Sequence, residues 1–181
     1  MAPISFFTVF FFFLLPFLSF SLPLETSNLL IQTCNATTYY DFCVASLSSS
    51  PRASTAADAT ALTGIAIDLG IANATNTSSF ASSLSKAARS PSLASLLAAC
   101  ADKYARAAEA LGSSRDALKE GNYDYASVHA SSAAEYPDVC RVLFQRSKGQ
   151  AAAAYPAELA RREDALKRLC AVALDIISLL S

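Results

Sequence analysis

Cysteine is the residue type best able to do chemistry in this sequence of 181 residues. A thiol can act as a nucleophile, bind a metal or form a disulfide, and in a secreted chain the disulfide is the usual outcome. An odd number of cysteines then leaves one thiol unpaired. The five cysteines are Cys34, Cys43, Cys100, Cys140 and Cys170. Their spacing alone allows several pairings, so the pairing has to be inferred from the elements that carry them.

The other reactive side chains give little support for a catalytic site. His129 is the only histidine, and a lone histidine among many serines defines no catalytic triad. The sequence contains no nucleophile elbow, phosphate-binding loop or dinucleotide-binding fingerprint. Thiols that form disulfides are also unable to bind zinc. We therefore expect no enzymatic activity, no cofactor and no metal site.

The start of the chain is typical of a secretory signal peptide. Its first 24 residues carry no charged side chain and are rich in Phe and Leu. Ser19 and Ser21 provide the small residues needed for cleavage after Ser21, which predicts a signal peptide at 1–21 and secretion. An uncleaved membrane anchor is the alternative, because the apolar run is almost long enough to span a bilayer. Pro16 and the serines disfavour that alternative.

Charge and length limit what the remainder of the chain does. The formal net charge is −1 and there is no long basic run, which argues against nucleic-acid binding. No later stretch is long and apolar enough to span a membrane, so we expect no membrane partner once the signal is cleaved. Roughly 160 residues suit one domain with one core, at 22–181.

The composition after the signal indicates an all-α protein. Ala, Leu and Ser dominate, only five Gly occur in the whole chain, and strand-like runs are almost absent. Ser90-Pro91 has the pattern of a helix start, and Gly121-Asn122 that of a helix end and turn. Between them apolar residues recur every three or four positions along one face: Leu93, Leu97, Cys100, Tyr104, Ala107, Leu111 and Leu118.

Three more segments have the same helical period. One follows Gly121 and is expected to kink or open locally at Pro137, and one follows Pro156. The third spans about 55–89, where the polar stretch NATNTSSF predicts a bend or fraying. Four long helices with short connectors predict an antiparallel up-down four-helix bundle at 55–181. The residues before it, 22–54, are expected to form a short disulfide-stapled helical hairpin.

Helix geometry selects one long-range disulfide. In antiparallel helices, residues equally far from the connecting turn lie at the same level. Cys100 precedes Gly121 by 21 residues and Cys140 follows it by 19, and both lie on apolar faces. A Cys100–Cys140 bridge is therefore expected.

This pairing leaves Cys34 and Cys43 to form a local bridge within the hairpin. A hairpin so short buries too little surface to persist alone, and covalent closure restricts its unfolded state. Cys170 then remains as a free thiol. It lies at helical spacing from Leu166 and Ala173, which predicts a buried and unreactive side chain.

Two surface features complete the pattern. Sequons for N-glycosylation occur at Asn35, Asn73 and Asn76. A regular helix places Asn73 and Asn76 on the same face as buried apolar residues, so either the helix bends there or these two sites stay unmodified. In the segment ELARREDALKR, Glu158 with Arg162 and Glu163 with Lys167 have the spacing of ion pairs on a solvated helix face.

Four stretches of the sequence, taken in order, resemble the plant inhibitors of pectin methylesterase and of invertase (β-fructosidase). They are TCNATTYYDFCVASL, LAACADKYARAAEAL, EGNYDYASVHASSAAEYPDVCRVLF and the ending YPAELARREDALKRLCAVALDIISLL. The resemblance covers essentially the whole mature chain. It implies a non-catalytic protein of the cell wall or apoplast, or of the vacuole, present as a monomer or weak dimer. Its expected partner is a pectin methylesterase, bound one-to-one across the substrate cleft, with acid invertase as the alternative.

The resemblance also indicates candidate target contacts. In the invertase branch, a Pro-Lys-Phe motif near the start of a bundle helix enters the invertase active site. The matching positions here are Tyr123, Asp124 and Tyr125. Asp124 reverses the charge of the lysine, and an acidic active site would repel it. These positions therefore favour pectin methylesterase as the target.

A secreted carrier of a small apolar ligand is a more distant hypothesis. The Ala-rich helix faces disfavour it, because small residues bring helices together and leave little room for a cavity.

Overall fold

The computed structural model describes residues 28–147 and 154–181, so the predicted signal peptide lies outside the described residues. Within these ranges the chain forms six α-helices, one short 3-10 helix and no strand, which confirms the all-α prediction. The elements are α1 (Asn28–Asn35), α2 (Tyr40–Ser48), η1 (Pro51–Thr55), α3 (Ala59–Ala87), α4 (Pro91–Lys119), α5 (Tyr123–Arg146) and α6 (Ala157–Ile177).

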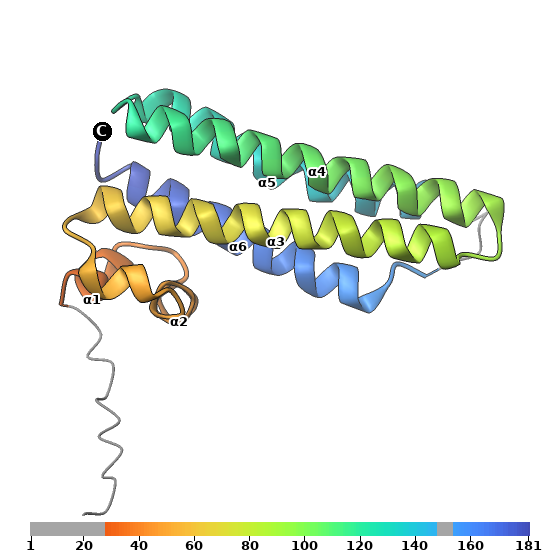
Figure 1. Cartoon of the computed structure of the whole chain (residues 1–181), viewed down its shortest axis with the longest axis horizontal. Coiled ribbons are helices and arrows are strands. Elements are labelled where there is room, and N and C mark those ends of the chain that lie inside the picture. Colours follow the sequence, from red (N-terminus) through yellow and green to blue (C-terminus); the bar gives the residue numbers. More distant parts are fainter. Residues whose placement is uncertain (1–27, 148–153) are drawn as a thin grey trace, which may run out of the picture.

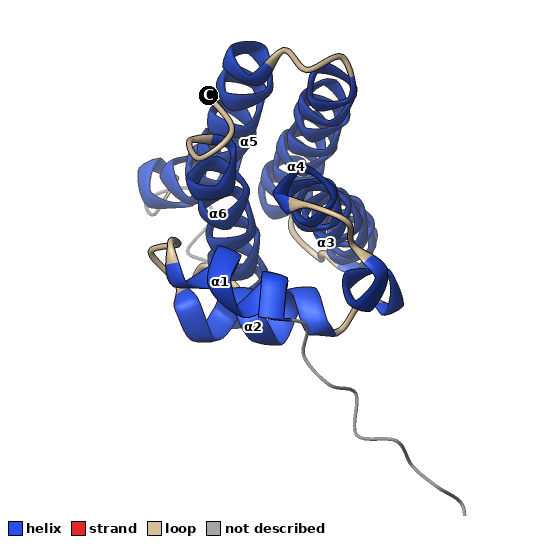
Figure 2. Cartoon of the chain, turned by 90° about the vertical axis from the view of Figure 1, so that its left-hand side faces the viewer, coloured by secondary structure: helices blue, strands red, loops and turns tan. Residues whose placement is uncertain are grey.

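Helices α3 to α6 form the predicted up-down bundle. Successive helices run in opposite directions, and each lies beside its two neighbours in a ring of four (Figure 1). As a result, α3 and α5 occupy opposite corners of the bundle (Figure 2). The apolar face expected along 93–118 is the buried face of α4, where Tyr104 and Cys100 are completely buried. None of the helices in the described residues is both long and apolar enough to cross a membrane.

The N-terminal hairpin packs on the end of the bundle where α3 begins and α6 ends (Figures 1 and 2). Its Cys34–Cys43 disulfide is present, with an S–S distance of 1.99 Å. The turn between its helices is attached to α6, because the backbone N–H of Thr38 donates to a carboxylate oxygen of Asp175 at 2.7 Å. The guanidinium of Arg168 lies 5.4 Å from the centroid of the Tyr39 ring. Covalent and tertiary contacts together therefore hold the hairpin in place.

Helix α3 corrects the prediction of a bend in its polar middle. It continues without interruption through NATNTSSF, where two polar side chains bond to carbonyl groups. Thr77 donates to the carbonyl of Asn73 at 2.7 Å, and Ser78 donates to the carbonyl of Ala101 on α4 at 2.8 Å. Asn76 is nevertheless exposed. The hairpin and η1 pack near the start of α3 (Figure 1).

Helix α5 also continues through its proline, and Pro137 is buried on the face toward the core. Proline has no N–H and so makes no bond to the carbonyl one turn earlier, but packing maintains the helix. The Cys100–Cys140 disulfide lies three residues further along, with an S–S distance of 2.01 Å. The remaining cysteine, Cys170, is free and buried.

Candidate functional site

The turn between α4 and α5 determines where α5 starts. Gly121 has a φ of 71°, which a residue with a Cβ rarely adopts. Its N–H donates to the carbonyl of Leu118 at 3.1 Å, and the N–H of Asn122 donates to that of Ala117 at 2.9 Å. These two bonds form a Schellman cap on α4. The predicted helix end at Gly121-Asn122 is thereby confirmed.

The next residues present the candidate contact side chains. The side chain of Asn122 accepts a bond from the N–H of Tyr125 at 3.3 Å and so caps the N-terminus of α5. Asp124 is exposed in the first helical turn, where its negative charge interacts favourably with the positive end of the helix dipole. Tyr123 is half-buried, whereas 62 % of Tyr125 is exposed. The three candidate residues therefore lie together at one end of the bundle.

A shallow hollow of about 410 Å³ adjoins this turn. Glu120 and Asp124 contribute carboxylates to its lining, and no Lys or Arg lines it in the described part of the chain. Ser181 lies on its far side. The head of α5 therefore presents negative charge beside two tyrosines, a combination that suits a partner with cationic groups.

Exposed apolar side chains lie on the outer side of α5 in two groups, Tyr125 with Val128 and Val139 with Val142, with the exposed Ser132 and Glu135 between them. Seven large hydrophobic side chains are exposed in the described residues, and four of them belong to α5. At 100° per residue these four fall within about a quarter of the helix circumference, on the side opposite the core face. We call them the α5 stripe: Tyr125, Val128, Val139 and Val142.

The α5 stripe was not found from the sequence. The search followed the apolar residues that repeat every three or four positions, and those form the core face of α5. The valines lie off that pattern. Valine is a poor helix former, and 64 % of Val128 is exposed. Neither core packing nor helix propensity explains Val128, which lies one turn after the exposed Tyr125 at the start of α5.

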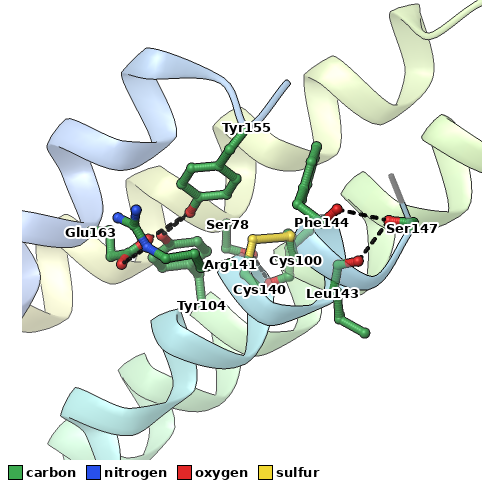
Figure 3. Close-up of a disulfide and its surroundings, with 11 residues drawn as sticks. Ser78, Cys100, Tyr104, Cys140, Arg141, Leu143, Phe144, Ser147, Tyr155 and Glu163 are labelled. Atoms are coloured by element: carbon green, nitrogen blue, oxygen red, sulfur yellow. Dashed lines mark hydrogen bonds and ion pairs between the residues drawn. A yellow bond between two sulfur atoms is a disulfide. The ribbon is translucent and has the colours of Figure 1, made fainter. Parts of the chain in front are cut away.

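Several interactions hold α5 against its neighbours. At its start, the buried hydroxyl of Ser114 on α4 donates to the carbonyl of Ala126 at 2.7 Å. Near its other end the Cys100–Cys140 disulfide joins it to α4, as Figure 3 shows. Lys167 on α6 reaches Asp138 at 2.7 Å. The stripe and its head are therefore carried by a rigid helix, which reduces the ordering that binding requires.

A buried polar cluster corrects the expectation of a fully solvated charged face on α6. Glu158 and Arg162 do pair on the surface at 2.8 Å. Glu163, however, is only 2 % exposed, and it accepts bonds from Arg141 of α5 at 2.8 Å and from the Tyr155 hydroxyl at 2.7 Å (Figure 3). Burial raises the pKa of Tyr155, so this hydroxyl keeps its proton and can donate to the carboxylate. The cluster fastens the end of the α5–α6 connector to the bundle.

His129 lies on α5 one turn after Tyr125, and the centroids of the two rings are 6.4 Å apart. It is half-buried. Across residues 28–147 and 154–181, no three or more His, Cys, Asp and Glu side chains are grouped to hold a metal ion. The residues that the structure brings together at this end are thus a rigid, partly acidic, partly apolar surface suited to binding.

These features define a class of protein, a helical bundle cross-linked by two disulfides. Residues 28–176 match the sequence family described as plant invertase/pectin methylesterase inhibitor, and the chain belongs to that family. It is therefore an enzyme inhibitor, and its partner is an enzyme.

Individual relatives include inhibitors of both kinds of enzyme. The chain is 44 % identical over 165 residues to pectinesterase inhibitor 28 of Oryza sativa subsp. japonica, an alignment that covers 87 % of this chain and 71 % of the relative. It is 42 % identical over 154 residues to cell wall / vacuolar inhibitor of fructosidase 2 of Arabidopsis thaliana, covering 84 % and 83 %.

A solved structure supports the fold independently. The crystal structure of mutant form A of a pectin methylesterase inhibitor from Arabidopsis superposes with a TM-score of 0.69. The sequences are 22 % identical, and the superposition covers 86 % of this chain and 99 % of the other. The shared fold is a helical bundle.

Proposed function

We propose that this chain is a secreted, non-catalytic inhibitor that binds a plant pectin methylesterase one-to-one in the cell wall. Occlusion of the substrate cleft then restrains pectin de-esterification. The observation that carries the choice of target is the acidic head of α5. Asp124 is exposed beside Glu120, at the position where the invertase branch has a lysine. A negative charge there disfavours binding to an enzyme with an acidic active site, because the like charges repel.

The α5 stripe supplies the apolar part of the proposed interface. Tyrosine is among the residues that contribute most to binding, because it buries a large rigid area and keeps a polar end. Tyr125 is the largest exposed side chain of the stripe and adjoins the acidic head. We assign it the central position, with Val128 beside it and the remaining valines along the helix.

Inhibition of an acid invertase is the second candidate. It is favoured by the 42 % identity to an inhibitor of fructosidase, which extends over most of both chains. Under this alternative the aromatic side chains at 123 and 125 would still meet the enzyme, and the charge at Asp124 would not determine the target.

A side-by-side titration tests the choice. The disulfide-bonded mature protein is added to a plant pectin methylesterase and to an acid invertase, and residual activity is measured. We expect saturable inhibition of the esterase alone. Replacing Asp124 with Lys should weaken that inhibition and leave the fold unchanged. Inhibition of invertase alone would contradict the proposal.

A matched pair of tyrosine variants tests the surface. Tyr125→Ala should raise the inhibition constant by about 30-fold, equivalent to roughly 2 kcal/mol for a central interface tyrosine. Tyr40→Ala removes an exposed tyrosine from the hairpin, away from α5, and should change the constant less than about twofold. Equal effects of the two variants would argue against α5 as the contact surface.

Secretion and glycosylation are part of the same proposal. The side chains of Asn35 and Asn76 are exposed, and Asn73 is half-buried with its amide oxygen 3.5 Å from the Thr77 hydroxyl. We therefore place glycans on Asn35 and Asn76. Peptide mapping of protein secreted by plant cells tests this assignment, and a glycan on Asn73 alone would contradict it.

A further inference from the structure

The outer side of α5 has a residue spacing that the bundle core does not require. Its exposed positions alternate three and four residues apart along most of the helix, and we call them the heptad face: Tyr125, Val128, Ser132, Glu135, Val139 and Val142. In a two-stranded coiled coil, positions with this spacing face a partner helix. The neighbours of α5 within the chain, α4 and α6, pack against its opposite, buried side. The heptad face therefore has no helix against it in the described chain.

The order of residues along the heptad face is self-complementary. When two identical helices run antiparallel about a two-fold axis, each residue meets the one that lies equally far on the other side of the axis. With the axis midway along the heptad face, Tyr125 meets Val142 of the second copy. Val128 likewise meets Val139 of the second copy. Each apolar group is thus matched with an apolar group, in successive layers of an antiparallel coiled coil.

The charges at the two ends of α5 select the antiparallel orientation. Asp124 is exposed in its first turn and Arg146 in its last, and at 100° per residue both lie on the side of the heptad face. Neither belongs to an ion pair within residues 28–147 and 154–181. Antiparallel pairing brings Asp124 of each copy near Arg146 of the other. A parallel pair would instead place like charges together.

The centre of the heptad face is polar and limits the strength of the pairing. The exposed Ser132 meets Glu135 of the second copy on each side of the axis. A serine hydroxyl is small and can donate to a carboxylate, so the two helices are able to approach. The two Glu135 carboxylates lie near the axis and repel each other. A polar residue in a coiled-coil seam fixes the register at a cost in stability, so we expect a weak dimer.

We propose that two copies of this chain pair antiparallel through the heptad faces of α5. The hairpin packs on α3 and α6, at the far side of the bundle from α5, and does not obstruct this pairing (Figure 2). One helix from each copy buries less area than a stable complex does, which predicts a dissociation constant of about 0.1 mM. The pairing covers Tyr125 and Val128 and so masks them from the target enzyme. The masking rests on the proposed function, whereas the pairing does not.

Sedimentation equilibrium of the disulfide-bonded mature protein measures the pairing without any enzyme. We expect a reversible monomer–dimer equilibrium. Glu135→Leu completes the apolar seam and removes the repulsion at the axis, so it should tighten the dimer by at least about tenfold. The matched control is Glu109→Leu, which replaces an exposed glutamate on α4 and should change the dissociation constant less than about twofold.

An exchange of the end charges tests the antiparallel orientation. Asp124→Lys and Arg146→Glu should each weaken the dimer by at least about threefold, because each change places like charges together at both ends of the symmetric pair. The double variant should return to within about twofold of the original dissociation constant. These residues are 22 positions apart, about 33 Å along the helix, so the recovery has to arise between two copies. Circular dichroism confirms that each variant is folded.

Sedimentation of concentrated Glu135→Leu protein with an equimolar amount of plant pectin methylesterase tests the masking. We expect one-to-one complexes and loss of the dimer, because the enzyme and the second copy both need Tyr125. A complex of two inhibitors with two enzymes would overturn the masking. The absence of any complex would contradict the proposed function and with it the masking, while the pairing is decided by the measurements on the protein alone.

Three results would overturn the pairing. These are a monomer at every concentration up to about 1 mM, an unchanged dissociation constant for Glu135→Leu, or no recovery in the charge-exchanged double variant. A dimer that is lost in Tyr40→Ala and unaffected by Glu135→Leu would show that the copies pair through the hairpin instead.

Discussion

The buried carboxylate of Glu163 offers the most direct test of how this bundle is held together. It accepts one bond from Arg141 and one from the Tyr155 hydroxyl, at 2.8 and 2.7 Å. The bond to Glu163 raises the pKa of the Arg141 guanidinium, which therefore stays charged. Glu163→Gln retains the shape of the side chain and removes its charge. Hydrogen bonds to a charged group contribute about 1.5–3 kcal/mol and neutral ones about 0.5–1.5.

Two weakened bonds therefore predict a loss of about 2 kcal/mol in the free energy of unfolding for Glu163→Gln. Arg141→Met leaves the carboxylate buried with Tyr155 as its remaining partner. Breaking a fully buried pair costs about 3–5 kcal/mol. The Arg141 side chain is 43 % exposed, so solvent screening places the expected loss nearer 3 kcal/mol. In the double variant the neutral amide no longer needs a cation, so the losses should fall about 1–2 kcal/mol short of their sum.

Urea unfolding followed by far-UV circular dichroism measures these changes, provided that the slope with denaturant stays constant. The matched control is Asp164→Asn on the same helix. That carboxylate is 61 % exposed and pairs with Arg168 at 2.9 Å, so the change should stay below about 0.5 kcal/mol. A Glu163→Gln value as small as the control, or strictly additive losses in the double variant, would refute the assigned role of the buried charge.

Three further predictions concern the helices and the cysteines. Gly64→Ala should stabilise the protein by about 0.5–1 kcal/mol in urea unfolding, because its Cβ has room, whereas Gly70→Ala should destabilise it, because its Cβ would lie 2.9 Å from a leucine methyl. The same sign for both would contradict the packing argument. Replacing Cys100 and Cys140 together with Ala opens a bridge between residues 40 apart and should lower the free energy of unfolding by about 4 kcal/mol. Burial raises the pKa of the Cys170 thiol from 9.0 to about 12, so its contribution to stability is present below pH 9 and is lost as the pH rises toward 12. Iodoacetamide at pH 8 should therefore label this thiol only in denaturant, and rapid labelling of native protein would contradict its burial.

The sequence by itself determined the helices and the long-range disulfide. Periodicity reports which face of each helix is apolar, because burial must repeat with the helical turn. Gly121 marks the turn, since its positive φ suits glycine. Once the turn is placed, the near-equal distances of Cys100 and Cys140 from it predict their bridge. Each of these inferences uses information within one helix or one connection.

The tertiary structure decided what lies across from each helix. Glu163 and Lys167 have the spacing of a surface pair, yet both bond to α5, because a neighbouring helix offered closer partners. Asn76 is exposed on a regular helix, because the buried face of this part of α3 consists of Gly70, Ala74, Thr77 and Ala81. The α5 stripe likewise depends on which surfaces remain uncovered. Periodicity identifies a buried face, but the position of the covering element depends on contacts between residues far apart in the chain.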